Sequence, residues 1–426
     1  NGAPVLSSQG RMFPVKTIYG TPYRYGERIA ERAAATVTHV LREQSGSLLV
    51  FLPGQGEIRQ VQQRLQRWLS EQPDGDDILL TPLFGDLSLA DQRRAIEACP
   101  AGQRKIVLAT NIAETSLTID GVSVVIDSGL CRQPSFDPST GMTRLSTQRV
   151  SKASATQRAG RAGRLEPGVC YRLWSESQQD ELAAFSSAEI QQADLAPLAL
   201  QLLQWGVSDP HELSWSDAPA VAPYQQALSL LEKLGAVVHK DTRWSLTAHG
   251  ELMARLPAHP RLAHMILMGQ SVGLATQACE LAALLGERDL VQGAGADLSL
   301  RLDLLRGVRR AERQQQGSLA RLKKLQQQFK RLLPKTSADV DLPRVPDPDE
   351  HRWTSLLLAW AYPDRVAAQR SKGSAQYLLS NGRAAALRER DGLSANRWLV
   401  VAELGGQQGQ RQDQIYLAAS LDDEHF

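Results

Sequence analysis

Three arginines, one glutamine and two glycines lie within the eight residues Gln157–Arg164. On a helix, Gln157, Arg161 and Arg164 have the spacing i, i+4 and i+7 and share one face, whereas Arg158 points elsewhere. Two guanidinium groups on one face cannot neutralise each other, and their planar forks match the oxygens of a phosphate. The spacing therefore predicts an anion-binding face, with a solvated basic helix as the alternative.

The two glycines of this stretch, Gly160 and Gly163, are poor helix formers, each at a cost of roughly 1 kcal/mol relative to alanine. A sequence that carries both indicates a close approach of the backbone to another element.

Two further stretches have glycine or hydroxyl side chains where an α/β domain binds ligands. Gly54 lies in a turn that follows the apolar run 48–52, where backbone amides can face an anion. Residues 110–121 follow another apolar run and are rich in hydroxyl, amide and carboxylate groups, which also suit capping and turns.

These stretches must be positioned by the elements around them. Short apolar runs alternate with helical patterns between residues 15 and 175, which predicts a parallel α/β sheet. Two strand-like runs, 130–136 and 142–148, flank a turn-forming loop and predict a hairpin. Residues 1–14 are polar and contain glycine and proline, as linkers do.

Beyond residue 175 helical patterns dominate. Residues 176–250 have the order helix, helix, hairpin and predict a winged-helix domain, and residues 251–370 predict a helical domain. Three short strand patterns in residues 371–426 predict a small β-barrel. Because such a barrel needs about five strands, either the pattern hides strands or the barrel is partial.

Composition narrows the class of protein. The net charge of +2 over 426 residues carries no information about nucleic acid, but ten basic residues gather in the range 301–331, where an RNA path and a solvated face are the alternatives. The four cysteines have no metal-ligand or redox spacing and predict buried thiols in a reducing, cytoplasmic location. No apolar run predicts a membrane span and no signal peptide is recognisable. His259 and His264 are expected to be structural, and Trp205, Trp215 and Trp244 to lie in the core.

Taken in order, the run Thr110–Gly121, the run Val124–Gly129 and the run Ser151–Arg164 resemble the second RecA-like domain of DEAH-box ATP-dependent RNA helicases. Residues 48–58 resemble motif IV of that family, residues 110–121 its motif V, and residues 157–164 its motif VI. The run 361–366 resembles the bacterial HrpB-type subfamily. The resemblance implies an α/β RecA-like domain at 15–175, a winged helix at 176–250, a ratchet-like helical domain at 251–370 and a partial OB-like barrel at 371–426.

The resemblance also implies roles for single residues at a nucleotide site. Arg161 and Arg164 match arginine fingers that, with Gln157, meet the γ-phosphate of ATP or the attacking water. Asp120 matches a carboxylate that contacts the nucleotide, and Ser116 matches a serine that senses the nucleotide state. Ile96 stands where the family often has an aromatic residue on the adenine, so slack base selectivity is expected.

Further roles implied by the resemblance concern RNA. Thr110 and Asn111 match contacts to the RNA backbone, and Gly54 is expected to contribute to the same binding. Such contacts position an RNA without reading its sequence. The hairpin at about 130–148 matches the one that separates strands, and the family moves 3′ to 5′.

No Gly-x-x-x-x-Gly-Lys-[Ser/Thr] occurs in the sequence, and no Asp-Glu-Ala-His. The resemblance therefore implies that ATP and Mg²⁺ are bound mainly by a first RecA-like domain that precedes this chain, so the chain alone is expected to be inactive. The charge of residues 157–164 is then expected to stay unsatisfied within the chain. Two alternatives remain: a non-catalytic RNA-binding adaptor that retains one of the two motor domains, and a DNA helicase with the same fold.

Overall fold

The computed structural model describes residue 4 and residues 13–85, 87–100, 102–115, 117–137, 142–241, 243–287, 289–291, 293–312, 315–334, 345, 353–405 and 412–422. The chain divides into two units. The first, called here the sheet unit, comprises residues 1–135 and 145–189, and the second, called the C-terminal unit, comprises residues 136–144 and 190–426.

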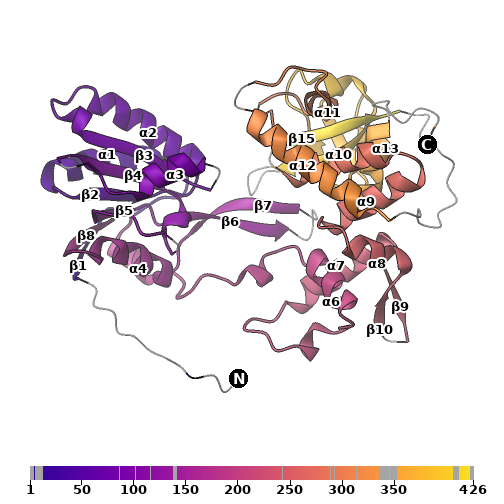
Figure 1. The fold of residues 1–426 in the computed structure, drawn as a ribbon, viewed down its shortest axis with the longest axis horizontal. Coiled ribbons are helices and arrows are strands. Elements are labelled where there is room, and N and C mark those ends of the chain that lie inside the picture. Colours follow the sequence, from indigo (N-terminus) through magenta and orange to yellow (C-terminus); the bar gives the residue numbers. More distant parts are fainter. Residues whose placement is uncertain are drawn as a thin grey trace. The chain divides into compact units, whose positions relative to one another are not determined.

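A six-stranded parallel sheet forms the sheet unit (Figure 1). Its strands in spatial order are β1 (Val15–Tyr19), β8 (Gly168–Arg172), β5 (Val122–Asp127), β2 (Ser47–Phe51), β4 (Arg104–Ala109) and β3 (Ile78–Leu83). The central strand β2 is apolar and buried on both faces, which is the pattern of a parallel sheet covered by helices. All six strands lie between residues 15 and 175, where the sequence predicts a parallel sheet.

Both faces of this sheet carry helices. Leu48 and Val50 point into a core with α1 (Ile29–Glu43) and α2 (Gln55–Leu69), which lie on one face. Leu49 and Phe51, the alternate residues, point into a second core on the other face. That second core contains Ala95 of α3 (Leu89–Ile96) and Ala159 of α4 (Lys152–Gly160). A short helix, α5 (Glu176–Asp180), follows β8.

The predicted hairpin is present. Strands β6 (Leu130–Asp137) and β7 (Met142–Arg149) form a separate two-stranded sheet. Residues 138–141 of its expected turn lie outside the described residues.

The C-terminal unit starts with the helix, helix, hairpin order that the sequence predicts. Its elements are α6 (Ala196–Gln204), α7 (Val221–Lys233), β9 (Val237–Lys240), β10 (Arg243–Leu246) and α8 (Ala248–Ala254). A run of helices follows: α9 (Pro260–Ser271), α10 (Ala275–Gly286), α11 (Ser299–Arg306), α12 (Gln316–Leu332) and α13 (Trp353–Ala361).

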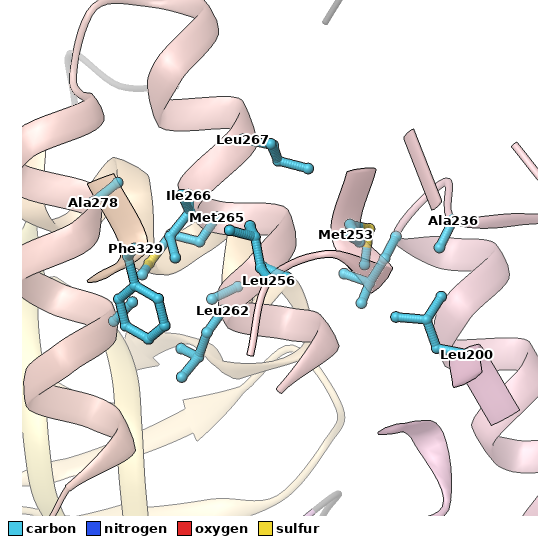
Figure 2. Close-up of a cluster of buried hydrophobic side chains, with 14 of the residues drawn as sticks. Leu200, Ala236, Met253, Leu256, Leu262, Met265, Ile266, Leu267, Ala278 and Phe329 are labelled. Carbon is cyan, nitrogen blue, oxygen red and sulfur yellow. The ribbon is translucent and has the colours of Figure 1, made fainter. Parts of the chain in front are cut away.

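One hydrophobic core runs through these helices. Figure 2 shows Ala236, Leu200 of α6 and Met253 of α8 in the same cluster as Ile266 of α9 and Phe329 of α12. The elements α6 to α8 and the helices α9 to α12 therefore share a core. The division at residue 250 remains a prediction, as do the other domain boundaries.

The barrel at the end of the chain is closed, so the expectation of a partial barrel was wrong. Its five strands in order are β11 (Val366–Gln369), β12 (Gln376–Leu379), β13 (Ala384–Ala386), β15 (Asp413–Leu421) and β14 (Trp398–Gly405). The sequence pattern missed β11 and β13 because both are short and rich in alanine, which lacks the alternation typical of a strand.

The predicted fold class is confirmed: a RecA-like parallel sheet, a helical region and a small barrel. Within the described ranges, no helix combines the length and the apolar character that a membrane crossing requires. Cys131, Cys170 and Cys279 are buried free thiols as expected, whereas Cys99 is only half-buried.

Candidate functional site

Helix α4 carries the first part of the arginine stretch but ends at Gly160. Ser151 caps its start, because the Ser151 hydroxyl accepts a hydrogen bond from the Ser154 amide at 3.1 Å. Residues Arg161–Gly163 then form a 3₁₀ turn. The predicted single helical face for Gln157, Arg161 and Arg164 is therefore wrong, since the helix stops before the second of them.

The close backbone approach predicted for the glycines occurs at Gly163. A Cβ atom at this position would lie 2.5 Å from the carbonyl oxygen of Phe13. The Phe13 amide donates to the Gly163 carbonyl at 2.9 Å. This glycine therefore lets the arginine stretch lie against the segment that leads into β1.

Arg158 is buried, with a side chain that is 1% exposed. Its Nη1 donates to Asp127 Oδ1 at 2.9 Å and its Nε to Glu114 Oε2 at 3.0 Å. The guanidinium also lies over the ring of Phe51, with 4.9 Å between Cζ and the ring centroid. Burial alone lowers the pKa of Arg158, but the Asp127 and Glu114 carboxylates outweigh it and hold the pKa above its usual range. Arg158 thus holds α4 on the end of β5.

Arg161 is also buried, at 7% exposure, but it contacts main-chain carbonyls. Its Nε donates to the Glu114 carbonyl at 2.9 Å, its Nη1 to the Leu117 carbonyl at 2.6 Å, and its Nη2 to the Glu114 carbonyl. Burial lowers the pKa of Arg161 and the neighbouring positive charge of Arg164 lowers it further, whereas the negative charge of Glu114 offsets part of this decrease.

Arg164 is exposed, and its Nη1 donates to the Thr118 hydroxyl at 2.8 Å. All three arginines therefore bind one loop, whose described residues 110–115 and 117–118 we call the clasp loop. The expectation that their charge stays unsatisfied within the chain is wrong for Arg158, which has two carboxylate partners. Within the part of the chain that the structure describes, no ion pair joins a carboxylate to Arg161 or Arg164.

The predicted nucleic-acid residues meet at one edge of the sheet. Thr110 and Asn111 follow β4, and Gly54 follows β2, which is the neighbouring parallel strand. The Thr110 amide donates to the Leu83 carbonyl at 3.2 Å, which fixes the start of the clasp loop beside β3. Asn111 is exposed, and Gly54 is buried as the residue that precedes α2. Carboxyl ends of parallel strands are where sheets of this kind bind ligands.

Sequence reasoning missed Arg132 at this edge. A Cβ atom on Gly54 would lie 2.4 Å from Arg132 Nη1, so the guanidinium lies directly against this glycine. Arg132 Nη2 donates to Glu57 Oε1 at 2.9 Å, which joins β6 to the first turn of α2. Arg132 stands in a strand of the hairpin, and only the fold brings it to Gly54.

Asp120, predicted to contact the nucleotide, and Ile96, predicted to lie on the base, also come together. The Asp120 amide donates to the Ile96 carbonyl at 3.3 Å. Ile96 ends α3 and is half-buried, whereas the Asp120 side chain is exposed. Gln157 is exposed on α4. Ser116, predicted to sense the nucleotide state, lies outside the described residues.

The other candidates belong mainly to the C-terminal unit. Arg301 and Arg306, the first residues of the basic run, are paired with Asp289 and Glu280, so this part of the run is internal. His259 and His264 have structural partners, as expected: His259 contacts Asp194 at 3.0 Å and His264 contacts His249 at 2.8 Å. Trp215 and Trp244 are half-buried, but Trp205 is 72% exposed, so its predicted place in the core was wrong. In the described ranges, no three side chains form a candidate metal site.

Comparisons with known proteins agree with this geometry. Residues 31–166 match the family described as helicase conserved C-terminal domain. The chain is 42% identical over 420 residues to the ATP-dependent RNA helicase HrpB of Escherichia coli (strain K12), which covers 99% of this chain and 48% of that protein. It is 34% identical over 333 residues to the ATP-dependent RNA helicase DHX33 of Homo sapiens, with 78% of this chain and 46% of that protein covered.

Two solved structures of HrpB are also similar to this chain over nearly its whole length. The crystal structure of Escherichia coli DEAH/RHA helicase HrpB matches with a TM-score of 0.83 and 40% identity over 99% of this chain and 49% of that chain. The crystal structure of E. coli DExH-box NTPase HrpB matches with a TM-score of 0.80 and 41% identity over 98% of this chain and 47% of that chain. The chain thus spans about half the length of these relatives.

Proposed function

Because this chain corresponds over nearly its whole length to the C-terminal half of an HrpB-type DEAH/RHA helicase, we propose that it is the second half of an ATP-driven RNA motor. In this proposal the sheet unit supplies Arg161, Arg164 and Gln157 to a nucleotide held by the other half of the parent protein. The chain also supplies part of the path for RNA.

The observation that carries the proposal is the pair Arg161 and Arg164. They are close enough for the charge of Arg164 to lower the pKa of Arg161, and their hydrogen bonds go to carbonyl and hydroxyl oxygens. Two guanidinium groups held together, neither of them in an ion pair with a carboxylate among the described residues, fit a phosphate, to which each can donate two parallel hydrogen bonds. Arginine fingers of this kind stabilise charge on the transferred phosphoryl group and raise turnover by about 1000-fold or more.

Asp120 and Ile96 would hold the nucleoside. Their main-chain hydrogen bond places an exposed carboxylate beside an apolar side chain. The carboxylate suits a hydrogen bond to a ribose or to the edge of a base, and the apolar side chain suits contact with the face of a base. Isoleucine lacks the π-face of an aromatic residue, so selectivity for adenine over other bases is expected to be weak. The role proposed for Ser116 rests on the resemblance alone.

RNA would bind along the carboxyl edge of β2 and β4. Thr110, Asn111 and Gly54 meet there, and Arg132 adds a half-exposed guanidinium beside Gly54. Backbone amides, short polar side chains and an arginine are the groups that bind phosphates without reading bases. The hairpin β6–β7 would separate strands as the motor moves 3′ to 5′.

ATP supplies the free energy and the phosphoryl group when it is bound in the parent protein. The phosphate-binding lysine and the Mg²⁺ ligands would come from residues that this sequence does not contain. The residues of this chain would orient the terminal phosphate and exclude water from it. A cytoplasmic location, where the three buried thiols stay reduced, is part of the same proposal.

ATP hydrolysis by the parent protein, measured with single-stranded RNA and with DNA of the same base sequence, tests the proposal. We expect RNA to raise turnover and DNA to have little effect. Stimulation by DNA alone would instead support the DNA helicase alternative. RNA binding without any ATP hydrolysis would support a non-catalytic adaptor.

A further inference from the structure

A pocket of about 470 Å³ lies within the C-terminal unit, between the loop that precedes α7, the first half of α7 and the hairpin β9–β10. Its volume falls in the range of about 300–1,000 Å³ that is usual for pockets that bind small molecules. Pro210, Pro219 and Leu228 form buried apolar walls. The pocket plays no part in the nucleotide site or the RNA path proposed above.

Two aromatic rings from the hairpin line this pocket. His239 of β9 and Trp244 of β10 are cross-strand partners, and their ring centroids are 4.7 Å apart. Trp244 is half-buried, and its amide donates to the Ser208 hydroxyl at 3.3 Å. His239 is exposed, so its ring is available for contact with a further ring. Unstacked RNA bases bind proteins by stacking on aromatic side chains of this kind.

Tyr224 of α7 lines the same pocket and is 3% exposed. Its hydroxyl is buried and has no hydrogen-bond partner among the described residues. A buried hydroxyl without a partner is unfavourable, so a ligand atom that accepts its hydrogen bond gains affinity. Burial, and after it the charge of Asp209, raise the pKa of Tyr224 to about 12, so the hydroxyl keeps its proton at neutral pH.

The Asp209 carboxylate provides an acceptor beside this donor. Its Oδ1 accepts a hydrogen bond from the His211 amide at 2.9 Å and lies 2.8 Å from His211 Nδ1. These contacts lower the pKa of Asp209, so the carboxylate is ionised at neutral pH. Its side chain is 60% exposed and lines the pocket. A donor and an acceptor side by side match the edge of an RNA base, which offers hydrogen-bonding groups of both kinds.

Two cations lie next to the aromatic pair, toward the turn of the hairpin. Lys240 and Arg243 are exposed cross-strand partners, and like charges directly opposite each other are destabilising. The turn between them contains one acid, Asp241, so this end of the hairpin keeps a positive charge. The cations point to the other face of the hairpin from the aromatic pair, because side chains alternate along a strand. A strand of RNA that crosses the edge of the hairpin would meet the rings with a base and the cations with a phosphate.

We propose that this pocket binds one base of single-stranded RNA. The base stacks on His239 and Trp244, and its edge bonds to Tyr224 and Asp209. The pocket thus adds a contact to a base to a protein whose other proposed RNA contacts meet the backbone. This inference rests on the proposed function, because it needs RNA as the substrate. A free nucleotide carries the same base, so the test distinguishes the two sources.

The test is the Kd of the parent protein for a fluorescein-labelled single-stranded RNA and for an abasic RNA of the same length, measured by fluorescence anisotropy. We expect His239→Ala to raise the Kd for the normal RNA about tenfold, the effect of one lost stacking contact. The Kd for the abasic RNA should stay the same, because it reports only contacts to the backbone. Trp205→Ala is the matched control, since this tryptophan belongs to the same unit, is 72% exposed and does not line the pocket. It should change neither value.

Tyr224→Phe separates ligand binding from folding. It removes a hydroxyl that has no partner in the folded chain, so the free energy of unfolding should not fall. The Kd for the normal RNA should still rise about fivefold, the equivalent of one hydrogen bond. A purely structural role for Tyr224 would not produce this combination.

An unchanged RNA Kd in both His239→Ala and Tyr224→Phe, or an equal rise for the abasic RNA, would overturn the inference and leave the proposed function intact. Binding of AMP that is lost in His239→Ala, with no change in the RNA Kd, would assign the pocket to a free nucleotide and also overturn it. Failure of the unaltered protein to bind either RNA would contradict the proposed function itself.

Discussion

Arg158 Nη1 lies 2.9 Å from Asp127 Oδ1, and neither side chain is more than 1% exposed. The same guanidinium reaches Glu114 in the clasp loop, so one buried cation links α4, β5 and the loop. Removal of one partner from a buried ion pair is strongly destabilising, because the remaining charge stays buried without compensation. This arrangement makes Arg158 a structural residue in the middle of a stretch whose other arginines are proposed to bind phosphate.

Arg158→Met is therefore expected to lower the free energy of unfolding of the sheet unit by about 3–5 kcal/mol. Adding Asp127→Asn should restore part of this loss, because it removes one of the two unpaired carboxylates. Arg28→Met, at an exposed ion pair with Glu31, is the control and should have no measurable effect. Urea unfolding followed by circular dichroism gives all three values, and a loss below 1 kcal/mol in Arg158→Met would refute the structural role.

Gly129 joins β5 to the hairpin and has a φ of 73°. A Cβ atom there would also lie 2.6 Å from the ring of Trp174. Gly102 has a φ of 86° but open space around it. Alanine substitutions at the two glycines therefore distinguish the cost of the backbone conformation from the cost of steric overlap with Trp174. We expect Gly102→Ala to lower the free energy of unfolding by about 1 kcal/mol and Gly129→Ala to lower it by about 3 kcal/mol. Equal thermal unfolding temperatures for the two variants would show that the contact with Trp174 relaxes freely.

The His249–His264 contact predicts sensitivity to acid. Burial and the neighbouring His249 lower the pKa of His264 to about 4, from an ordinary value of 6.5. As the pH falls, His264 therefore becomes protonated in the unfolded chain at a higher pH than in the folded chain. Stability is full above pH 6.5 and falls as the pH drops toward 4. We expect the titration of His264 to lower the free energy of unfolding by about 2 kcal/mol between pH 7.5 and pH 5.

Urea unfolding of the chain at these two pH values measures that effect. His264→Gln should reduce the difference between them, whereas His39→Gln, at a side chain that is 62% exposed, should leave it unchanged. The same pH dependence in His264→Gln as in the unaltered chain would place the acid sensitivity elsewhere.

Arg132 is predicted to contact one RNA phosphate. In the parent protein, Arg132→Ala should weaken RNA binding about equally for all sequences. It should also reduce the slope of log K against log salt concentration by about 0.7, the value for one contact on a single strand. Arg64→Ala, which removes an arginine from the exposed side of α2, is the control. A slope that stays the same in Arg132→Ala would exclude the contact.

The sheet and its helices were predictable because each strand is a short apolar run bounded by turn residues. The placement of Gly54, Thr110 and Asn111 at one edge also followed, since parallel strands end together. The barrel was predicted only in part, because β13 is three alanines, and alanine carries no strand pattern.

The arginine stretch shows what spacing along the chain cannot provide. The partners of Arg158 stand 31 and 44 residues away in the sequence, so only the fold brings the three side chains together. Helical spacing placed Arg161 beside Gln157, but α4 ends at Gly160 and Arg161 turns onto the clasp loop. The resemblance to a helicase family identified the stretch, and the structure separates its arginines into one with two carboxylate partners and two that donate to carbonyl and hydroxyl oxygens.

RNA-stimulated ATP hydrolysis by the parent protein, with Arg161→Ala and Arg164→Ala, is the most direct measurement of the central claim. If these arginines complete a nucleotide site of the other half, each substitution should lower kcat by about 1000-fold with little change in nucleotide affinity. Turnover equal to that of the unaltered protein in both variants would contradict the assignment of either arginine to the phosphate.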